Sequence, residues 1–499
     1  MSPNRLAWLV LASFTALWCA RWPIFPVVLD PAYHVLIAQQ VAAAGGPILH
    51  EWWEAAPAGR PHLYPPIFHL LLAVPLRLGG DPVTVIRFAS VTLPPLLLLT
   101  LWLAVRRLFT PSLALSCLWI GVLPWVFHLH GAMALAAWLG LIELLWLVVA
   151  LERGRALAAG LVFAMLCYTH LGLPWIALLA LGCCALMRAA LRATLRRASW
   201  ALLLVLPWWW HLWSHRALLH AVPRFENTLT ELIPLMTLAA VLGLWRCWRV
   251  GGRFVWLIAL WVGFLALVPH YRYRWLDGEG MLPTVLLAGV GVEWLAQRLS
   301  RRHLTAEMMV CGLLVLVTFG PTLTVEQGRL EWRWVDSTPF HLGRAPDAAT
   351  GGRRLEMGVH GPKMEQLAGE VERLTQPGEI LWSNASYAGG WIAALIPRAL
   401  SSLMLDEIPS LPSHDPIRSA HLIVWFKMPT LGGGPTVEDL RRSPLERVAE
   451  TDLAILFRNP EATAPATMPQ AVMPLWLALA CLGGALAAIA CDAWRPSRT

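Results

Sequence analysis

Long apolar runs recur along almost the whole chain, and few folds can accommodate them. Twelve runs approach or reach the roughly 17 to 25 residues with which a helix crosses a bilayer. Of the 499 residues, 57% are hydrophobic and 14% are charged, whereas a soluble domain carries about 25% charged residues. The sequence therefore predicts an all-α polytopic membrane protein. Its spans are predicted near 5–22, 83–105, 110–128, 131–151, 156–170, 171–190, 198–214, 229–247, 254–269, 280–298, 304–321 and 471–491.

Arginine marks one side of this arrangement. If the N-terminus with Arg5 is cytoplasmic, every connection predicted on that side is basic, as the positive-inside rule requires. This predicts an inner-membrane protein with both termini cytoplasmic, and it explains the net charge of +8 without a nucleic-acid partner. The arginines concerned are Arg106, Arg107, Arg153, Arg155, Arg188, Arg192, Arg196, Arg197, Arg246, Arg249, Arg253, Arg298, Arg301, Arg302, Arg495 and Arg498.

The same register leaves three pieces on the outer side: 23–82, the loop 270–279, and 322–470. The first contains two short amphipathic candidates, 31–44 and 65–79, which are predicted to be helices lying in the interface. In 322–470 charged residues, glycine and proline return. The segments "GEILWSN", "AHLIVWF" and "DLAILFRNP" are typical of buried strands, and "KMEQLAGEVERL" is typical of a helix.

These patterns divide the chain into three parts. Residues 1–321 form the transmembrane module, with 23–82 as its first outer loop. A small α/β domain outside the membrane covers 322–470, and 471–499 form the last span and a cytoplasmic tail. The nine cysteines fall in or beside apolar runs, so they are interpreted as small buried hydrophobes rather than disulfides.

Asp30 opens the segment "LDPAYHVLIAQQVAAAGG", directly after the first apolar run. An Asp followed by proline is a good helix start, so Asp30 could be a cap. The same pair recurs at Asp81, where the cap interpretation is preferred. Asp30 differs from Asp81 in the polar residues near it. His34 shares its helix face, and Arg60, His62 and Tyr64 follow in "GRPHLYPPIFHLL".

An Asp soon after the first span, in a form like D-x-x-Y-H, followed by a Y-P-P helix in the same outer loop, resembles the GT-C superfamily of membrane glycosyltransferases. These enzymes use polyprenyl-phosphate-linked sugars, and they include protein O-mannosyltransferases and aminoarabinose transferases acting on lipid A. The resemblance covers the first 110 residues best. Two later segments resemble the superfamily more weakly: "YRYRWLDGEGMLPTVLLAGVGVEWL" and "ILWSNASYAGGWIAALIPRALSSLMLDE".

The resemblance implies an inverting hexosyl- or pentosyltransferase that serves cell-envelope glycosylation on the outer face. Asp30 would be the general base, while His34, Arg60, His62 and Tyr64 would line the cleft. Arg272 and Arg274, with His270, would bind the carrier phosphate through planar donor groups. The alternative for these arginines is contact with lipid headgroups.

A second carboxylate often assists in this superfamily, and Glu51 and Glu54 lie in the right loop. They lack the acidic-Lys-Pro context of the aminoarabinose enzymes, so they could equally be solvated loop charges, which leaves the acceptor class open. No cofactor is required; a divalent metal stays open. His128, His130 and His170 lie at outer span ends without a carboxylate at ligand spacing. Glu143 inside the fourth run is expected to face the bundle.

The implied partners are a polyprenyl-phosphate-linked sugar, membrane lipids, and a lipid, glycan or protein acceptor. The carrier would be undecaprenyl phosphate in a bacterium and dolichyl phosphate otherwise, and the scarcity of lysine beside abundant Arg, Ala and Leu favours a bacterium. The rival hypothesis is a lipid or sugar transporter or flippase with an outer receptor domain, which should place charged or broken helices at mid-membrane. A non-catalytic assembly scaffold is the third.

Overall fold

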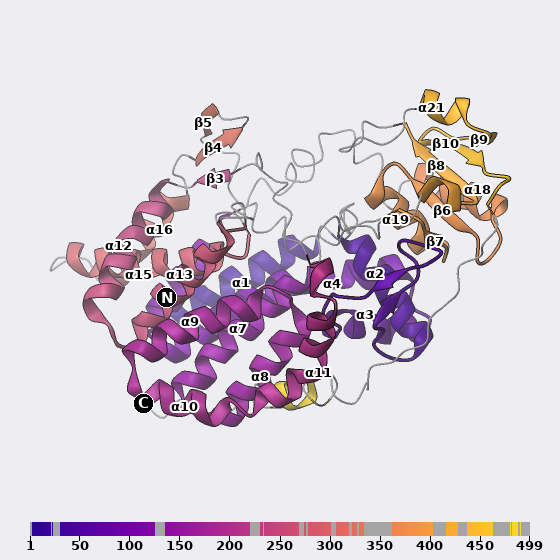
Figure 1. Ribbon diagram of the computed structural model, residues 1–499. Coiled ribbons are helices and arrows are strands. Elements are labelled where there is room, and N and C mark those ends of the chain that lie inside the picture. Colours follow the sequence, from indigo (N-terminus) through magenta and orange to yellow (C-terminus); the bar gives the residue numbers. More distant parts are fainter. Residues whose placement is uncertain are drawn as a thin grey trace.

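The described part of the chain is mostly helical and carries a smaller sheet-containing domain towards its C-terminal end (Figure 1). The structure is a computed structural model. It describes residues 2–20, 22, 30–124, 135–219, 230–232, 234–268, 274–275, 278–300, 306–318, 322–326, 329–333, 362–402, 416–427, 437–462, 480, 482–487 and 490.

Prolines and polar caps set the starts of many helices in the helical body. Pro3, Pro31, Pro82 and Pro111 occupy the first helical position, where no N–H is needed. The Thr110 hydroxyl accepts the N–H of Leu113 at 3.0 Å. The helices are α1 Pro3–Cys19, α2 Pro31–Ala44, α3 Ile67–Arg77, α4 Pro82–Leu108, α5 Pro111–Gly121, α7 Ala136–Glu152, α8 Ala156–Thr169, α9 Leu173–Met187, α10 Ala189–Ala198, α11 Ala201–Ser214, α12 Pro234–Val250, α13 Val255–Phe264, α15 Met281–Leu299 and α16 Ala306–Thr318.

The predicted apolar runs correspond to these helices. Each of the first eleven runs contains a described helix, whereas most of 471–491 lies outside the described residues. Among the described helices, only α4 is both long and apolar enough to cross a membrane by itself, and α5, α8 and α9 are shorter apolar helices. The number of twelve spans therefore stays a prediction.

Several connections that the arginine pattern predicts to be on one side lie close together. Glu152, at the end of α7, binds Arg188 from the α9–α10 connection, and its other oxygen lies 3.5 Å from Arg253 Nε, before α13. Arg253 also donates to the carbonyl oxygen of Leu108, the last residue of α4, at 3.2 Å. Connections that were all predicted to be cytoplasmic thus meet at one end of the helical body.

Helices α12 and α15 pack backbone against backbone at two glycines. A Cβ atom at Gly243 would lie 1.8 Å from the carbonyl oxygen of Leu287, and one at Gly291 would lie 1.9 Å from that of Ala239. Small residues allow such close approach between helices where no hydrophobic effect drives them together.

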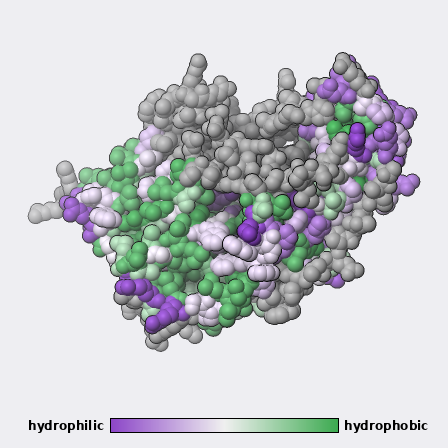
Figure 2. All heavy atoms as spheres, viewed as in Figure 1, coloured by the Kyte–Doolittle hydropathy of each residue, from purple (hydrophilic) through white to green (hydrophobic). Residues whose placement is uncertain are grey.

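Hydrophobic residues cover much of the viewed face of the helical body, whereas the surface of the sheet-containing domain is mainly hydrophilic (Figure 2). The exposed side chains include Trp175, Leu186, Leu203, Trp210 and Trp248. Apolar exposure on this scale needs an apolar environment. The helical body therefore has the surface expected of a protein embedded in lipid.

The sheet-containing domain is an α/β domain, as predicted. Its five strands lie in the order β7-β6-β8-β10-β9, with β6 parallel to β7 and β8, and β10 antiparallel to β8 and β9. The three predicted strands and the predicted helix are present, whereas β7, β9, α19, α20 and α21 were not predicted. The elements are α18 Pro362–Leu374, β6 Ile380–Ser383, α19 Ser386–Leu395, β7 Ala399–Leu400, α20 Pro416–Ser419, β8 Leu422–Phe426, α21 Val437–Arg442, β9 Glu446–Glu450 and β10 Ala454–Arg458.

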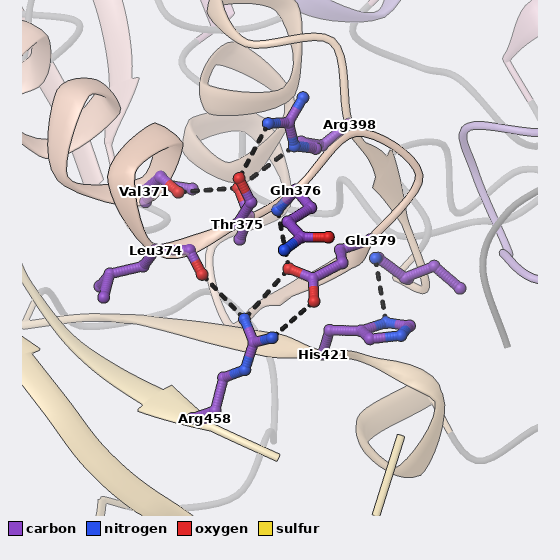
Figure 3. A network of polar contacts seen from close by, with 9 residues as sticks. Val371, Leu374, Thr375, Gln376, Glu379, Arg398, His421 and Arg458 are labelled. Carbon is purple, nitrogen blue, oxygen red and sulfur yellow. Dashed lines mark hydrogen bonds and ion pairs between the residues drawn. The ribbon is translucent and has the colours of Figure 1, made fainter. Parts of the chain in front are cut away.

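A polar network closes the turn between α18 and β6 (Figure 3). Arg458 of β10 donates to the carbonyl oxygen of Leu374 at 2.8 Å and to Glu379 at 3.0 Å. Arg398 donates to both the hydroxyl and the carbonyl oxygen of Thr375, each at 3.1 Å. His421 accepts the N–H of Ile380 at 3.2 Å. Side chains from three parts of the domain thus satisfy the polar groups of this turn.

The α/β domain rests on the first outer loop through backbone contacts. The N–H of Leu400 in β7 donates to the carbonyl oxygen of Trp53, and the carbonyl oxygen of Leu400 accepts the N–H of Ala56 at 2.9 Å. The Gln39 side chain of α2 donates to the carbonyl oxygen of Ala394 in α19 at 2.9 Å. Backbone hydrogen bonds therefore hold residues 53–56 against the edge strand β7.

Two smaller sheets complete the described part. The antiparallel pair β1 (His50–Glu51) and β2 (Arg60–Pro61) lies within the first outer loop. A separate three-stranded sheet has the order β3-β4-β5 and consists of β3 Thr230–Leu232, β4 Thr322–Glu326 and β5 Arg329–Arg333. Short 3-10 helices lie at Arg216–Leu218, Gly252–Phe254 and Leu265–Leu267.

Candidate functional site

The first outer loop folds back between α2 and α3 as the hairpin β1–β2. Its register places Glu51 directly opposite Arg60. Gly59 allows the tight return with a φ of +65°, and a Cβ atom there would lie 2.4 Å from the carbonyl oxygen of Glu51. Only glycine fits such a position. The hairpin therefore sets a carboxylate beside a guanidinium before any tertiary contact is considered.

Glu51, Glu54 and Arg60 form a buried ion cluster, and none of their side chains is more than 2% exposed. Arg60 Nε lies 3.0 Å from one oxygen of Glu51, and Arg60 Nη2 binds Glu54. His62 Nδ1 lies 3.7 Å from the same Glu51 oxygen, beyond hydrogen-bond distance. The interpretation of the two glutamates as solvated loop charges is wrong, because both side chains are fully buried.

The cluster sets the ionisation of its members. Burial alone would raise the pKa of the Glu51 carboxyl, but Arg60 and His62 outweigh it and the net direction is down. The Arg60 pKa is raised by Glu54 and Glu51 against the opposing effect of burial. Burial, followed by the charge of Glu51, raises the pKa of the Tyr33 hydroxyl. Two carboxylates and one guanidinium therefore lie together in a buried position, where water does not screen their charges.

A histidine pair links α2 to α3. His34 Nδ1 lies 3.0 Å from His69 Nε2. The His69 ring centroid lies 5.5 Å from that of His62, and the His34 ring centroid lies 5.3 Å from that of Tyr64. Burial lowers the pKa of His34 to about 3 and that of His69 well below its usual value, and neighbouring histidines add to both effects. Both rings are therefore neutral at pH 7.

His69 and Tyr33 are site residues that the sequence interpretation missed. Both stand inside the quoted motifs, at "PAYH" and "PPIFHLL". A periodicity argument could have found His69, since it lies three residues after Pro66 on the face of α3 that meets α2. Helix α2 itself was expected to be amphipathic, but it is buried on nearly all sides because α3, α4 and α19 surround it.

Several buried polar atoms in this region have no hydrogen-bond partner among the described residues. They are the Tyr33 hydroxyl, Glu51 Oε2, both ring nitrogens of His62, and His69 Nδ1. Most buried polar groups in proteins are paired. Their concentration within one loop is typical of a site that receives water or a polar ligand.

Asp30 begins α2, but its side chain does not cap the helix. Its carbonyl oxygen accepts the N–H of His34 at 3.2 Å, and the residue is half-buried. Asp81 behaves differently, because its carboxylate accepts the N–H of Thr84 at 2.7 Å. The cap interpretation is thus confirmed for Asp81, whereas Asp30 stands at a helix start without performing that task.

The second half of the site comes from later helices. His211 of α11 contacts the carbonyl oxygen of His62 at 2.8 Å through its Nε2. The ring of His170, which follows α8, meets that of Tyr64 edge-on at 6.5 Å. Arg274 lies 3.8 Å from Glu279, and the charges of both act on His170. His270 and Arg272, predicted with Arg274 for phosphate binding, lie outside the described residues.

Glu143 faces the bundle, as expected, since it is buried and accepts the hydroxyl proton of Thr169 at 2.7 Å. A metal site is less supported. Among the residues that the structure describes, no group of three or more His, Cys, Asp or Glu side chains is arranged to hold a metal ion. His128 and His130 lie outside those residues, so metal dependence stays open.

No protein-family model matches the chain, and no curated protein is similar to it in sequence. Solved structures are similar in fold. ArnT from Cupriavidus metallidurans in the apo state is 13% identical with a TM-score of 0.56, covering 91% of this chain and 97% of ArnT. ArnT bound to undecaprenyl phosphate gives a TM-score of 0.54 at 13% identity, over 91% of this chain and 98% of ArnT.

The archaeal oligosaccharyltransferase AglB from Archaeoglobus fulgidus, in complex with an inhibitory peptide and a dolichol-phosphate, is 9% identical with a TM-score of 0.54. The alignment covers 84% of this chain and 69% of AglB. At such identities the likeness establishes the fold. The fold that the sequence resemblance implied is therefore supported, and membership of the GT-C superfamily stays a proposal.

Proposed function

We propose that this chain is a membrane-embedded GT-C glycosyltransferase that moves a sugar from a polyprenyl-phosphate carrier to an acceptor on the outer face. The observation that carries the proposal is the likeness in fold, along nearly the full length of both chains, to a structure with bound undecaprenyl phosphate. The AglB complex, with its dolichol-phosphate and peptide, adds a second lipid carrier and an acceptor.

The proposed membrane arrangement follows the arginine pattern. The N- and C-termini are cytoplasmic, twelve helices span the bilayer, and α2, α3 and the α/β domain lie outside. The meeting of Arg188 and Arg253 at Glu152 supports one common side for these connections. His34, His62, His170 and Arg274 then belong to the opposite, outer end.

Asp30 is proposed as the general base. In the proposed reaction the acceptor oxygen attacks the anomeric carbon, and its proton passes to the Asp30 carboxylate. The bond between that carbon and the phosphate oxygen breaks, and the carrier phosphate leaves with the electron pair. Attack from the face opposite the leaving group inverts the anomeric centre. A carboxylate that is not used to cap its own helix supports this role.

The departing phosphate needs cations, because charge builds on its oxygens in the transition state. Arg274 and Arg272, with His270, are proposed to supply them. Arg60 is a poor candidate for this task, since Glu51 and Glu54 already occupy its guanidinium. Its role, with Glu51, Glu54 and His62, is instead to shape the acceptor side next to Tyr64 and His34. The proposal leaves the choice between a hexose and a pentose open.

The test compares Asp30→Asn with Asp81→Asn, two Asp-Pro helix starts that differ in capping. Purified proteins in lipid receive a panel of radiolabelled undecaprenyl- and dolichyl-phosphate sugars, and sugar release is measured with and without EDTA. We expect turnover by wild type and Asp81→Asn, and a loss of at least about a thousandfold in folded Asp30→Asn.

Other outcomes are equally informative. Unchanged turnover in Asp30→Asn would remove the base assignment and keep the transferase. If wild type neither turns over nor binds any carrier, the transporter hypothesis replaces the present proposal. Loss of activity with EDTA, restored by added divalent ions, would add a metal to the mechanism.

A further inference from the structure

A short basic helix, α10, connects α9 to α11 at one end of the helical body. Arg188, directly before α10, binds the buried carboxylate of Glu152, which also lies 3.5 Å from Arg253. The same carboxylate accepts the indole N–H of Trp256. Glu152 is thus already engaged by residues outside α10.

Helix α10 has one apolar and one basic face. Leu191 is buried and Leu195 packs against the same core, and the helix contacts α8 and α9. Arg192 and Arg196 are exposed and lie four residues apart, so their side chains are neighbours on the helix surface. Neither guanidinium has an ion pair or a hydrogen bond to any of the residues that the structure describes.

The residues on both sides of α10 indicate the depth at which it lies. Leu186 and Met187, which end α9, are exposed apolar side chains, and so are Leu202 and Leu203 near the start of α11. Hydrophilic residues gather at the lower left of Figure 2, where Figure 1 draws α10, directly beside a hydrophobic surface. Since that surface needs an apolar environment, the basic face of α10 lies where acyl chains give way to headgroups.

Two neighbouring guanidiniums at headgroup depth suit a phosphate. Guanidinium groups bind phosphate oxygens through paired N–H donors. Each basic residue near the surface of an anionic membrane adds about a fivefold gain in binding. The positive-inside rule accounts for arginine on one side of the membrane. It does not account for two arginines that lie side by side, without a carboxylate, opposite a buried leucine face.

We propose that the basic face of α10, formed by Arg192 and Arg196, is a docking site for an anionic phospholipid of the adjoining leaflet. The two guanidiniums bind its phosphate, and its acyl chains lie against the exposed leucines of α9 and α11. The partner is a phosphodiester headgroup with a net negative charge. The inference goes beyond the proposed transferase, because Figure 1 shows α10 far from α2 and the site around it.

Two double variants test the site. Arg192→Gln/Arg196→Gln removes both charges from α10. Arg249→Gln/Arg298→Gln is the matched control, since it removes the same charge from connections predicted on the same side, at arginines that each lie over a tryptophan ring. Dissociation constants of phosphatidylglycerol and phosphatidylcholine are measured by mass spectrometry of the intact, delipidated protein in detergent. The thermal denaturation midpoint is measured without added lipid.

We expect wild type to bind phosphatidylglycerol more tightly than phosphatidylcholine, whose choline cation offsets its phosphate. The α10 double variant should bind phosphatidylglycerol about thirtyfold more weakly, whereas the control should stay within about threefold of wild type. Both variants should keep the wild-type midpoint. Added salt should weaken phosphatidylglycerol binding by wild type more than by the α10 variant, because salt screens exposed charges.

Wild-type affinity in the α10 variant, or equal weakening in both double variants, would overturn the inference, because the charge of the whole surface would then attract the lipid. A lower midpoint of the α10 variant alone would also overturn it, because these arginines would then serve the fold. None of these results bears on the proposed transferase, which sugar release tests separately.

Discussion

The Nδ1 atom of His34 lies 3.0 Å from the Nε2 atom of His69, and both rings are buried and neutral. In the unfolded chain each imidazole titrates near pH 6.5. Since the pKa of His34 falls to about 3 on folding, the unfolded state binds more protons than the folded state between those values. Stability is therefore fully present above pH 6.5 and is lost as the pH falls.

The expected loss is about 1.4 kcal/mol per pH unit for each of the two imidazoles. Thermal denaturation midpoints in detergent at pH 7.5, 6.5 and 5.5 measure it, and His34→Gln should flatten the decline. Phe68→Leu is the matched control, because Phe68 packs on His34 from α3 and does not titrate. It should lower the midpoint equally at each pH. Identical slopes for wild type and His34→Gln would contradict the assignment.

Arg60→Met should be among the most destabilising single substitutions in the chain. It leaves the buried carboxylates of Glu51 and Glu54 without their cation, which costs about 3–5 kcal/mol. The amount of monodisperse protein on size-exclusion chromatography and the denaturation midpoint check this. Arg373→Gln is the control, since its pair with Glu370 is 63% exposed on the arginine side and its loss should leave the midpoint unchanged. Equal effects would mean that the Arg60 cluster is solvated.

Asp81→Ala should cost about 1 kcal/mol of stability, because it removes the oxygen that caps α4. Asp30→Asn should not lose this capping contribution, because its side chain does not cap α2. Midpoints and turnover are measured for both variants. Asp81→Ala should lose stability and keep turnover, whereas Asp30→Asn should lose turnover without losing a helix cap. A large stability loss in Asp30→Asn with turnover retained would reverse the roles assigned to the two residues.

Leu400→Pro should release the first outer loop from the α/β domain. Proline removes the N–H that donates to Trp53, whereas the bond from Ser401 N–H to Leu381 at 2.8 Å still holds β7 to β6. Hydrogen exchange measured over residues 53–58 should quicken by about tenfold, in line with the loss of one or two backbone hydrogen bonds. Leu400→Ala keeps the N–H and should exchange like wild type there. Equal quickening in both variants would assign the contact to side-chain packing.

The sequence predicted much of the fold, because the information for it is local. Apolar runs such as 83–105 exclude water-soluble elements, and the arginines beside them predict which helix ends lie together. The strand in "AHLIVWF" and the helix in "KMEQLAGEVERL" show in their residue periodicity. The prediction of amphipathic helices failed at α2, because burial by α19 depends on a segment more than 340 residues away.

The candidate site was predicted in part. The sequence identified four residues because they lie near one another in one loop: His34, Arg60, His62 and Tyr64. The structure brings them together with Arg274 near His170. His69 and Tyr33 were missed, and Glu51 and Glu54 could not be distinguished from solvated charges. A carboxylate in a sequence carries no sign of its burial, since burial depends on which backbone covers it.

The sequence by itself determined the class of protein, the periodicity of its elements and the Asp-Pro starts of α2 and α4. Only the tertiary structure decided that one of these two aspartates caps its helix and the other does not, and that Nδ1 of His170 accepts two backbone N–H groups at the start of α9. The physical reason is that a side chain's partners are set by distances of about 3 Å between segments far apart in the chain. Such distances are fixed only when the helices, the hairpin and the α/β domain pack together.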